Sequence, residues 1–202
     1  MTLAAQTIAS QSEDLGAARR AMIDSQLRVS GINQDWLLAA LARVPREDHV
    51  PASARGHAYI DRAIPLNGGH ALPAPLVQAM LLAEAIPVAA DKVLVISPAG
   101  YLSALVEPLV QSVETVSPAG VKAVQAKGVF NLILIDGAIE QLPGNLAEAL
   151  VDGGRVVTGL VLRGVTRLAA GTKDGGGVAL APLAEVGIPV LAEFAAPKAW
   201  SF

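Results

Sequence analysis

The feature that most constrains the fold is an alternation of short apolar runs with helical stretches between residues 92 and 162. Four apolar runs have the length and composition of buried strands, at residues 92–96, 112–116, 130–135 and 155–162. Helical stretches are predicted between them, at residues 103–110, 121–126 and 145–151. Strands that alternate with helices in this way form a parallel sheet with helical crossovers. We therefore expect an α/β fold with a Rossmann-like, mostly parallel sheet.

The N-terminal region, residues 1–90, is predicted to form a helical cap on this sheet. A first helix, capped at Ser12-Glu13-Asp14, is expected to stop at Gly31, and a second helix to begin at an Asn33 cap. A third helix is predicted over residues 76–86. Apolar residues at helical spacing would turn one face of each helix toward the core.

The C-terminal part of the chain shows no helical spacing. Residues 165–170 and 178–183, joined around three consecutive glycines, predict an antiparallel hairpin. A final strand is expected over residues 190–194. We expect a single domain over residues 1–202, in which residues 91–202 form the Rossmann-like core and pack against the helical cap.

Composition excludes several classes of protein. Hydrophobic residues make up 52% of the chain, yet no apolar run approaches the roughly 18 residues of a membrane span, so no membrane partner is expected. A net charge of −3 argues against a nucleic-acid partner. The absence of cysteine rules out disulfides, thiol catalysis and cysteine-zinc sites, and no other metal site is predicted. Together with an N-terminus that lacks a secretory signal, this favours a cytoplasmic protein.

Several segments resemble the protein-L-isoaspartate O-methyltransferase family, and the resemblance extends from about residue 21 to residue 202. They are the opening helix Ala21–Arg28, the "VPRE" turn Val44–Pro51, Ala58–Asp61 with Ile64–Leu66, and the later strands Leu134–Ala138 and Gly153–Val157. The Val-Pro-Arg-Glu turn is the most family-specific of them, whereas Gly-Gly-Arg after a helix occurs in methyltransferases generally. The resemblance implies methyl transfer from S-adenosylmethionine to the free carboxylate of an isoaspartyl residue in damaged protein.

The turn after the first strand departs from the family pattern, which is similar to "VLD-x-GxGxGYSAA". Glycine is needed in such a turn because the backbone bends sharply close to the ligand. Here Val95 stands at the acidic position, and the three glycine positions hold Ser97, Ala99 and Tyr101. Pro98 also removes an amide donor, and a one-residue gap would restore only Gly100. The sequence therefore predicts a turn that no longer holds the cofactor in the ordinary way.

The end of the second strand also lacks a family feature, the acid that accepts hydrogen bonds from the ribose. Ser117–Gly120 contains no carboxylate, and Glu114 lies inside the strand, where a solvated role is expected. Only residues 117–129 separate this strand from the next, which is room for one crossover. The family's third strand is therefore expected to be missing.

Loss of that strand would leave the segment Ser112, Val113, Glu114, Thr115 and Val116 as a new sheet edge. An edge strand presents unpaired backbone groups to solvent. A second copy of the chain or another protein partner is expected to bind there, unless a loop covers the edge.

The substrate side is altered as well. The family's "GQTIS-x-P" segment is matched by residues 69–75, where Pro73 replaces the serine and His70 the glutamine. Pro73 has neither a hydroxyl nor an amide proton, so no catalytic residue is assigned there. His70 remains a weak candidate beside a capping or surface role, and neither His49 nor His57 has an evident carboxylate partner in the sequence.

The remaining candidate is Asp136, which is expected to end the third strand, where such folds place site residues. A cofactor-side contact competes there with a turn-forming Asp-Gly. Arg19, Arg20 and Arg28 could meet a carboxylate, although solvated charge is the stronger expectation. A degenerate remnant of the cofactor site would then consist of Ser97, Ala99, Gly100, Tyr101, Ser117 and Asp136.

Four parts of one catalytic apparatus are altered, while the framework around them persists. The leading hypothesis is a pseudoenzyme with impaired or lost S-adenosylmethionine binding that acts by binding or assembly, with no cofactor. The alternative is an active S-adenosylmethionine-dependent isoaspartyl carboxyl methyltransferase with a rebuilt pocket. A third hypothesis keeps the pocket for another small polar molecule, held by Ser97, Ser117 and Asp136.

Overall fold

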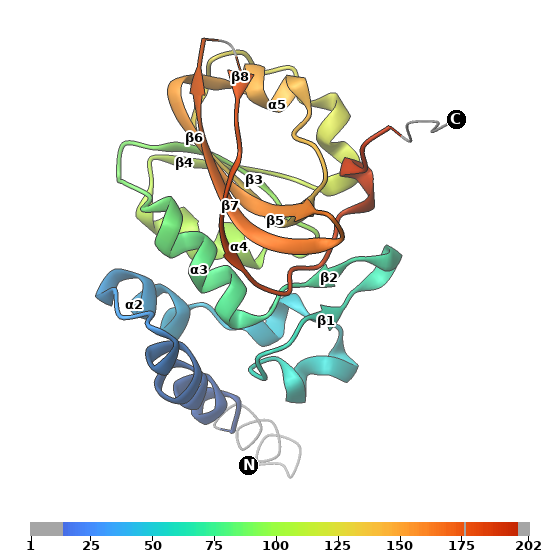
Figure 1. Ribbon diagram of the computed structural model, residues 1–202. Coiled ribbons are helices and arrows are strands. Elements are labelled where there is room, and N and C mark those ends of the chain that lie inside the picture. The colour runs from blue at the N-terminus through green and yellow to red at the C-terminus, as the bar shows by residue number, and fades with distance from the viewer. Residues whose placement is uncertain (1–13, 176, 198–202) are drawn as a thin grey trace.

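The computed structural model describes residues 14–175 and 177–197 and is built around one central sheet (Figure 1). The strand order is β4-β3-β5-β6-β7, and β7 also pairs with β8 and β9. The strands are β3 (Lys92–Ile96), β4 (Ser112–Val116), β5 (Phe130–Ile139), β6 (Leu150–Leu162), β7 (Val165–Asp174), β8 (Gly177–Val178) and β9 (Ala181–Glu185). β3 to β6 are parallel, and β7 to β9 add antiparallel pairs. The expected mostly parallel α/β fold with a C-terminal antiparallel hairpin is confirmed.

The two middle strands are buried on both faces, as parallel strands between helical layers must be. Residues 93–96 of β3 are fully buried, and β5 is buried at every position except Asn131. One core cluster joins this sheet to α3 (Pro75–Ala85) and α4 (Tyr101–Val106). A second cluster on the opposite face includes α5 (Gly144–Ala149). The branched aliphatic runs that predict the strands are therefore the centre of both cores.

The N-terminal helices lie beside α3 (Figure 1). The first helix spans residues 14–22. It continues through a π-helical turn, η1 (Ile23–Leu27), and a 3₁₀ turn, η2 (Arg28–Ser30), and ends at Gly31. Gly31 has a φ of 90°, which explains the expected stop, because glycine adopts that conformation at no steric cost. The predicted cap residues Ser12 and Glu13 lie outside the described residues.

The second helix, α2 (Asp35–Arg43), begins after Gln34, so the predicted cap at Asn33 is wrong. The side-chain oxygen of Gln34 accepts a hydrogen bond from the Asn33 amide, which draws the chain into a local turn before the helix. Between α2 and α3 the chain forms 3₁₀ turns and a small antiparallel pair. These are η3 (Arg46–His49), η4 (Ala52–His57), β1 (Ile64–Pro65), η5 (Asn67–Gly69) and β2 (Ala71–Leu72). Across the described ranges, no helix is long and apolar enough to cross a membrane.

The C-terminal segment differs from expectation. Residues 190–194 do not form a strand: Val190 makes one isolated bridge to Ala138, and the chain then turns into η8 (Ala192–Phe194). The cause lies at Gly137, where an added Cβ would stand 2.6 Å from Leu191 Cγ. Leu191 thus packs on the bare backbone of β5. Residues 190–194, here called the C-terminal strap, and the preceding Pro189 contact β5 through the Ala138 amide, which donates to the Pro189 carbonyl at 2.7 Å, and the Ala138 carbonyl, which accepts the Leu191 amide at 2.8 Å.

β4 lies at one end of the strand order, as the deletion predicts. In the described structure, the connection from β4 to β5 contains a 3₁₀ turn, η7 (Pro118–Ala123), and no strand. The helical stretch predicted at residues 103–110 is formed by α4 and the 3₁₀ turn η6 (Glu107–Leu109) that follows it. Among the described residues, β4 therefore forms one edge of the sheet.

Candidate functional site

Asp136 lies inside β5, not at its end, which corrects the sequence prediction. The strand continues to Ile139, and the ladder to β6 shifts register between Leu134, opposite Val157, and Ala138, opposite Gly159. The extra β5 residues form an irregularity of the kind that re-aims a side chain. The turn-forming Asp-Gly interpretation is therefore wrong, and the Asp136 side chain is fully buried.

The carboxylate of Asp136 is fully engaged by neighbouring side chains. Gln78 Nε2, from α3, lies 2.9 Å from Oδ1 and 3.1 Å from Oδ2, and Ser97 Oγ donates to Oδ2 at 2.8 Å. Burial raises the pKa of Asp136; the hydrogen bonds from Gln78 and Ser97 and the charge of Arg46 offset this only in part. A buried carboxylate is stable only when it is satisfied in this way.

Arg46 supplies the opposite charge and is also fully buried. Its guanidinium donates to Gln78 Oε1, to the Pro73 carbonyl and, at 2.7 Å, to the Ala58 carbonyl. Gln78 therefore bridges cation and anion, with its oxygen toward Arg46 and its amide nitrogen toward Asp136. Burial lowers the pKa of Arg46, but a guanidinium remains charged at neutral pH.

The turn after β3 is held by its own residues. Ser97 Oγ accepts hydrogen bonds from the amides of Ala99, at 3.3 Å, and Gly100, at 3.0 Å. Gly100 has a φ of 72° and precedes α4, so glycine is required here. His49 Nδ1 lies 3.0 Å from the Ala99 carbonyl, which makes Nδ1 the protonated nitrogen. The Ser97 hydroxyl, which stands at a family glycine position, therefore accepts two amides of the turn and also donates to Asp136.

Tyr101, at another family glycine position, is the first residue of α4 and is fully buried. The Arg46 guanidinium carbon lies 5.1 Å from its ring centroid, and the His49 ring centroid lies 5.3 Å away. Its hydroxyl has no hydrogen-bond partner in the described structure. Burial raises the pKa of Tyr101 to about 12, so the phenol is neutral. Its ring occupies the space between the turn and the segment that carries Arg46 and His49.

A second polar cluster fastens the first helix. Tyr59 Oη donates to Glu47 and accepts from Arg19 Nε at 2.6 Å and from the Arg46 amide at 3.3 Å. Arg19 also pairs with Glu47 at 2.9 Å. Burial and the hydrogen bond to Glu47 raise the pKa of Tyr59. Arg19 therefore meets a carboxylate of its own chain, while Arg28 pairs with Asp24 on the surface and Arg20 is exposed.

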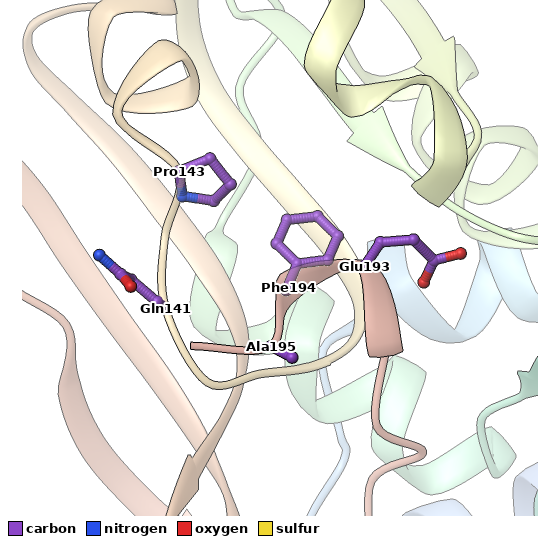
Figure 2. Close-up of a pocket in the computed structure, with 5 residues that line it drawn as sticks. All are labelled: Gln141, Pro143, Glu193, Phe194 and Ala195. Carbon is purple, nitrogen blue, oxygen red and sulfur yellow. The ribbon is translucent and has the colours of Figure 1, made fainter. Parts of the chain in front are cut away.

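His70 lies on the surface, where its Nε2 is 2.8 Å from Glu193 Oε1 on the C-terminal strap. Burial opposes ionisation of Glu193, but its own backbone amide and His70 outweigh that cost and lower its pKa. Glu193 also lines a small pocket of about 220 Å³, and its side chain points away from Gln141 and Pro143 on the other side of that pocket (Figure 2). The pocket is lined by Gln141, Pro143, Glu193, Phe194 and Ala195. His70 thus ties the β1–β2 hairpin to the strap.

The structure brings together only some of the predicted site residues. Ser97, Ala99, Gly100 and Tyr101 surround one turn, and Ser97 reaches Asp136. Ser117 is exposed before η7 and, within the described ranges, its side chain makes no hydrogen bond to Asp136. The remnant is therefore split into a buried part and an exposed serine.

Gln78 was not predicted as a site residue, and Arg46 was predicted only as part of the Val44–Pro51 turn that resembles the family. Gln78 is a polar residue within the apolar helix 75–85, and such a residue is buried only when partnered. That signal marks it as unusual, but its partner Asp136 is 58 positions away and cannot be identified from local pattern. Glu193 was not predicted as a contact residue either, because residues 190–194 were expected to form a strand.

Comparison with known proteins decides the family. Residues 17–118 match the family model described as Protein-L-isoaspartate(D-aspartate) O-methyltransferase (PCMT). The chain belongs to this family. The match covers η3, α3 and the turn after β3, and it ends at Pro118, where the shortened crossover begins.

Related proteins of this PCMT family agree. A protein-L-isoaspartate O-methyltransferase of Roseiflexus castenholzii is 32% identical, over 71% of this chain and 78% of its own. Protein-L-isoaspartate O-methyltransferase 2 of Anaeromyxobacter sp. is 30% identical, over 69% and 68%. A Plasmodium falciparum structure titled as a putative enzyme of this kind in complex with S-adenosyl-L-homocysteine has a TM-score of 0.69 at 17% identity, over 87% of this chain and 98% of that one. That structure supports the fold.

Proposed function

We propose that this PCMT family member is a pseudoenzyme with impaired or lost S-adenosylmethionine binding, which acts by binding or assembly. The observation that carries the proposal is the closed network that joins the turn after β3 to Asp136 inside β5. The Asp136 carboxylate is fully buried and receives hydrogen bonds from Gln78 and Ser97. A group committed in this way is not available to a ligand unless the network opens.

The residues present do not fit S-adenosylmethionine in the way that the family pattern describes. The amides of Ala99 and Gly100 are donated to Ser97 Oγ and not left for a ligand. Ser117–Gly120, at the end of β4, offers no carboxylate for a ribose. On the substrate side, the Pro73 carbonyl binds Arg46, and a hydroxyl is absent at that position.

The alternative is an active isoaspartyl carboxyl methyltransferase with a rebuilt pocket. Its support is the similarity to relatives named as protein-L-isoaspartate O-methyltransferases, at 30–32% identity. Such an enzyme would have to bind its cofactor without the three glycines and the ribose acid. The third hypothesis, a different polar ligand held by Ser97, Ser117 and Asp136, has less support, because Ser117 is exposed while Asp136 is sealed.

A methyl-transfer assay separates the proposal from the alternative. The purified chain, made in a host without its own isoaspartyl methyltransferase, is incubated with radiolabelled S-adenosylmethionine and an isoaspartyl peptide. The Roseiflexus castenholzii relative serves as positive control. We expect transfer no faster than in the sample without protein. Turnover at a rate similar to that of the relative would establish the alternative and reject the proposal.

A further inference from the structure

The outer edge of β4 presents backbone groups that have no partner in the sheet. The Val116 carbonyl accepts the Ser97 amide at 3.1 Å, so Val116 points its backbone groups toward β3. Because successive strand residues alternate in direction, Val113 and Thr115 point their N–H and C=O groups away from β3. Among residues 14–175 and 177–197 these groups have no backbone partner, so they can pair with one further strand.

Little protects this edge. Ser112, Glu114 and Thr115 are exposed, and β4 is the last strand on its side of the sheet. The opposite edge, at β9, is interrupted by Pro182 and by a register shift against β7. Natural sheets guard their edges with such features, and on β4 only the charge of Glu114 has that role. The two edges thus differ in their readiness to accept a strand.

We propose that β4 pairs antiparallel with β4 of a second copy, about a two-fold axis at Val113. The inference deepens the assembly part of the proposed function and does not require loss of cofactor binding. An axis at Glu114 would bring two glutamates directly opposite each other, which is unfavourable. An axis at Thr115 would use the Ser117 carbonyl, which already accepts the Gly120 amide at 2.9 Å, and an axis at Val113 would use the Gln111 amide, which already donates to the Asp91 carbonyl at 2.9 Å. Each of these two registers therefore loses one hydrogen bond on each side of the axis, and charge distinguishes between them.

Charge complementarity favours the same register. With the axis at Val113, Glu114 lies opposite Ser112 of the second copy. Ser112 pairs in register with Lys92 on β3, so Lys92 stands on the same face one strand further in. At about 4.8 Å per strand, the Cα atoms of Glu114 and the partner's Lys92 lie about 10 Å apart across a small serine, which both side chains can span. The two-fold axis creates this contact twice.

Both charges are free to make that contact. Lys92 and Glu114 are exposed, and neither forms an ion pair within the described part of its own chain. A paired edge of five residues buries little area, so we expect a weak, concentration-dependent dimer.

The test is sedimentation equilibrium of the full chain over a concentration series up to the millimolar range. We expect a monomer–dimer equilibrium whose dissociation constant rises about tenfold in Glu114→Lys, because two contacts change from attraction to repulsion. The charge-swapped double variant Glu114→Lys/Lys92→Glu should restore the original constant to within about threefold. Glu84→Lys, an equal charge change at an exposed position of α3, is the matched control and should leave the dissociation constant unchanged.

A monomer at every concentration would overturn the proposal, as would a dimer that Glu114→Lys leaves unchanged or that the double variant fails to restore. Val113→Pro removes the amide at the two-fold axis and should abolish the dimer, while its circular dichroism spectrum shows whether it folds. Calorimetric titration with S-adenosyl-L-homocysteine is run on the same samples. Binding of that ligand by a dimer would reject only the proposed loss of cofactor binding, and a monomer without binding would reject only the dimer.

Discussion

The network around Asp136 inside β5 and the outer edge of β4 are two polar regions of one sheet that differ in whether their polar groups have partners. At β5, Asp136, Gln78 and Arg46 are fully buried and bonded to one another. At β4, the outward backbone groups of Val113 and Thr115 have no partner within the part of the chain that the structure describes, and Glu114 beside them is exposed. The first region lies where the family resemblance places chemistry, and the second is the edge at which the sequence predicts that the family's third strand is absent.

This difference predicts how substitutions in each region should affect stability and association. Buried polar groups that satisfy one another contribute to stability, and removing one leaves the others unpaired. Exposed edge groups are already hydrated, so changing their neighbours affects association more than folding. Substitutions at the β5 network should therefore cost much more stability than those at the surface.

The largest effect is expected for Arg46→Met, which keeps the length of the side chain and removes its charge. Asp136 would remain buried without a compensating cation, at a cost of about 3–5 kcal/mol in the free energy of unfolding. Urea denaturation measures that cost. Arg28→Met, which breaks only the exposed pair with Asp24, is the control and should change stability by less than about 0.5 kcal/mol. Equal effects of the two substitutions would remove the distinction between the regions.

The cost of Arg46→Met should also depend on pH. Burial already raises the pKa of Asp136, and loss of the Arg46 charge, which lowers it, would raise it further. The folded variant then binds a proton at a pH where the unfolded chain does not, so its stability falls as pH rises through that range. The stability gap to the unsubstituted chain should therefore shrink as pH falls. A gap independent of pH would mean that Asp136 does not carry the cost.

Two buried tyrosines should behave oppositely when each loses its hydroxyl. Tyr59→Phe removes a group bonded to Arg19, Glu47 and the Arg46 amide, and should cost about 1–3 kcal/mol in the free energy of unfolding. Tyr101→Phe removes a hydroxyl without a partner and should leave stability unchanged within about 0.5 kcal/mol, or raise it. A loss of similar size at both positions, measured by thermal unfolding, would show that Tyr101 makes a polar contact.

A smaller effect is expected at the surface pair of His70 and Glu193. The Glu193 side chain is 27% exposed, and solvent-screened pairs of this kind contribute between zero and about 1 kcal/mol. Because the pKa of Glu193 is lowered, its contribution is present above its ordinary value of 4.5 and is lost as pH falls through the lower folded value. Glu193→Gln should therefore differ from the unsubstituted chain near neutral pH and match it in acid. A difference that persists in acid would point to packing of the strap instead.

The smallest effect should come from the sheet edge. Glu114→Gln replaces an exposed side chain that makes no ion pair in the described structure, so the free energy of unfolding should stay within about 0.5 kcal/mol. Chemical denaturation at low protein concentration, where the chain is monomeric, gives this value. A larger loss would show that the edge is covered within the monomer.

The sheet could be predicted from sequence because its signals are local. The strands 92–96 and 112–116 were expected with the bounds that the structure shows, since each is a short apolar or β-branched run between breakers. The same kind of run at residues 190–194 does not form a strand. Leu191 packs against Gly137, which is far away in the sequence, so no local pattern could indicate this contact.

At the site, only the absence of family residues could be predicted from the sequence. The missing glycines and the replaced serine are visible in the sequence, and they direct attention to Ser97 and Pro73. What those residues do instead depends on Gln78 and Arg46, which come from distant segments of the chain. A polar network is assembled by tertiary packing, so no spacing rule could connect its members.

The central claim, that the closed network has replaced cofactor binding, is tested most directly by thermal unfolding with and without saturating S-adenosyl-L-homocysteine. A ligand at about 100 times its dissociation constant adds about 2.7 kcal/mol to the free energy of unfolding. For a domain of this size, at about 2–4 °C per kcal/mol, the midpoint would rise by several degrees. We predict no change in the midpoint. A clear rise would contradict the account and favour an enzyme with a rebuilt pocket.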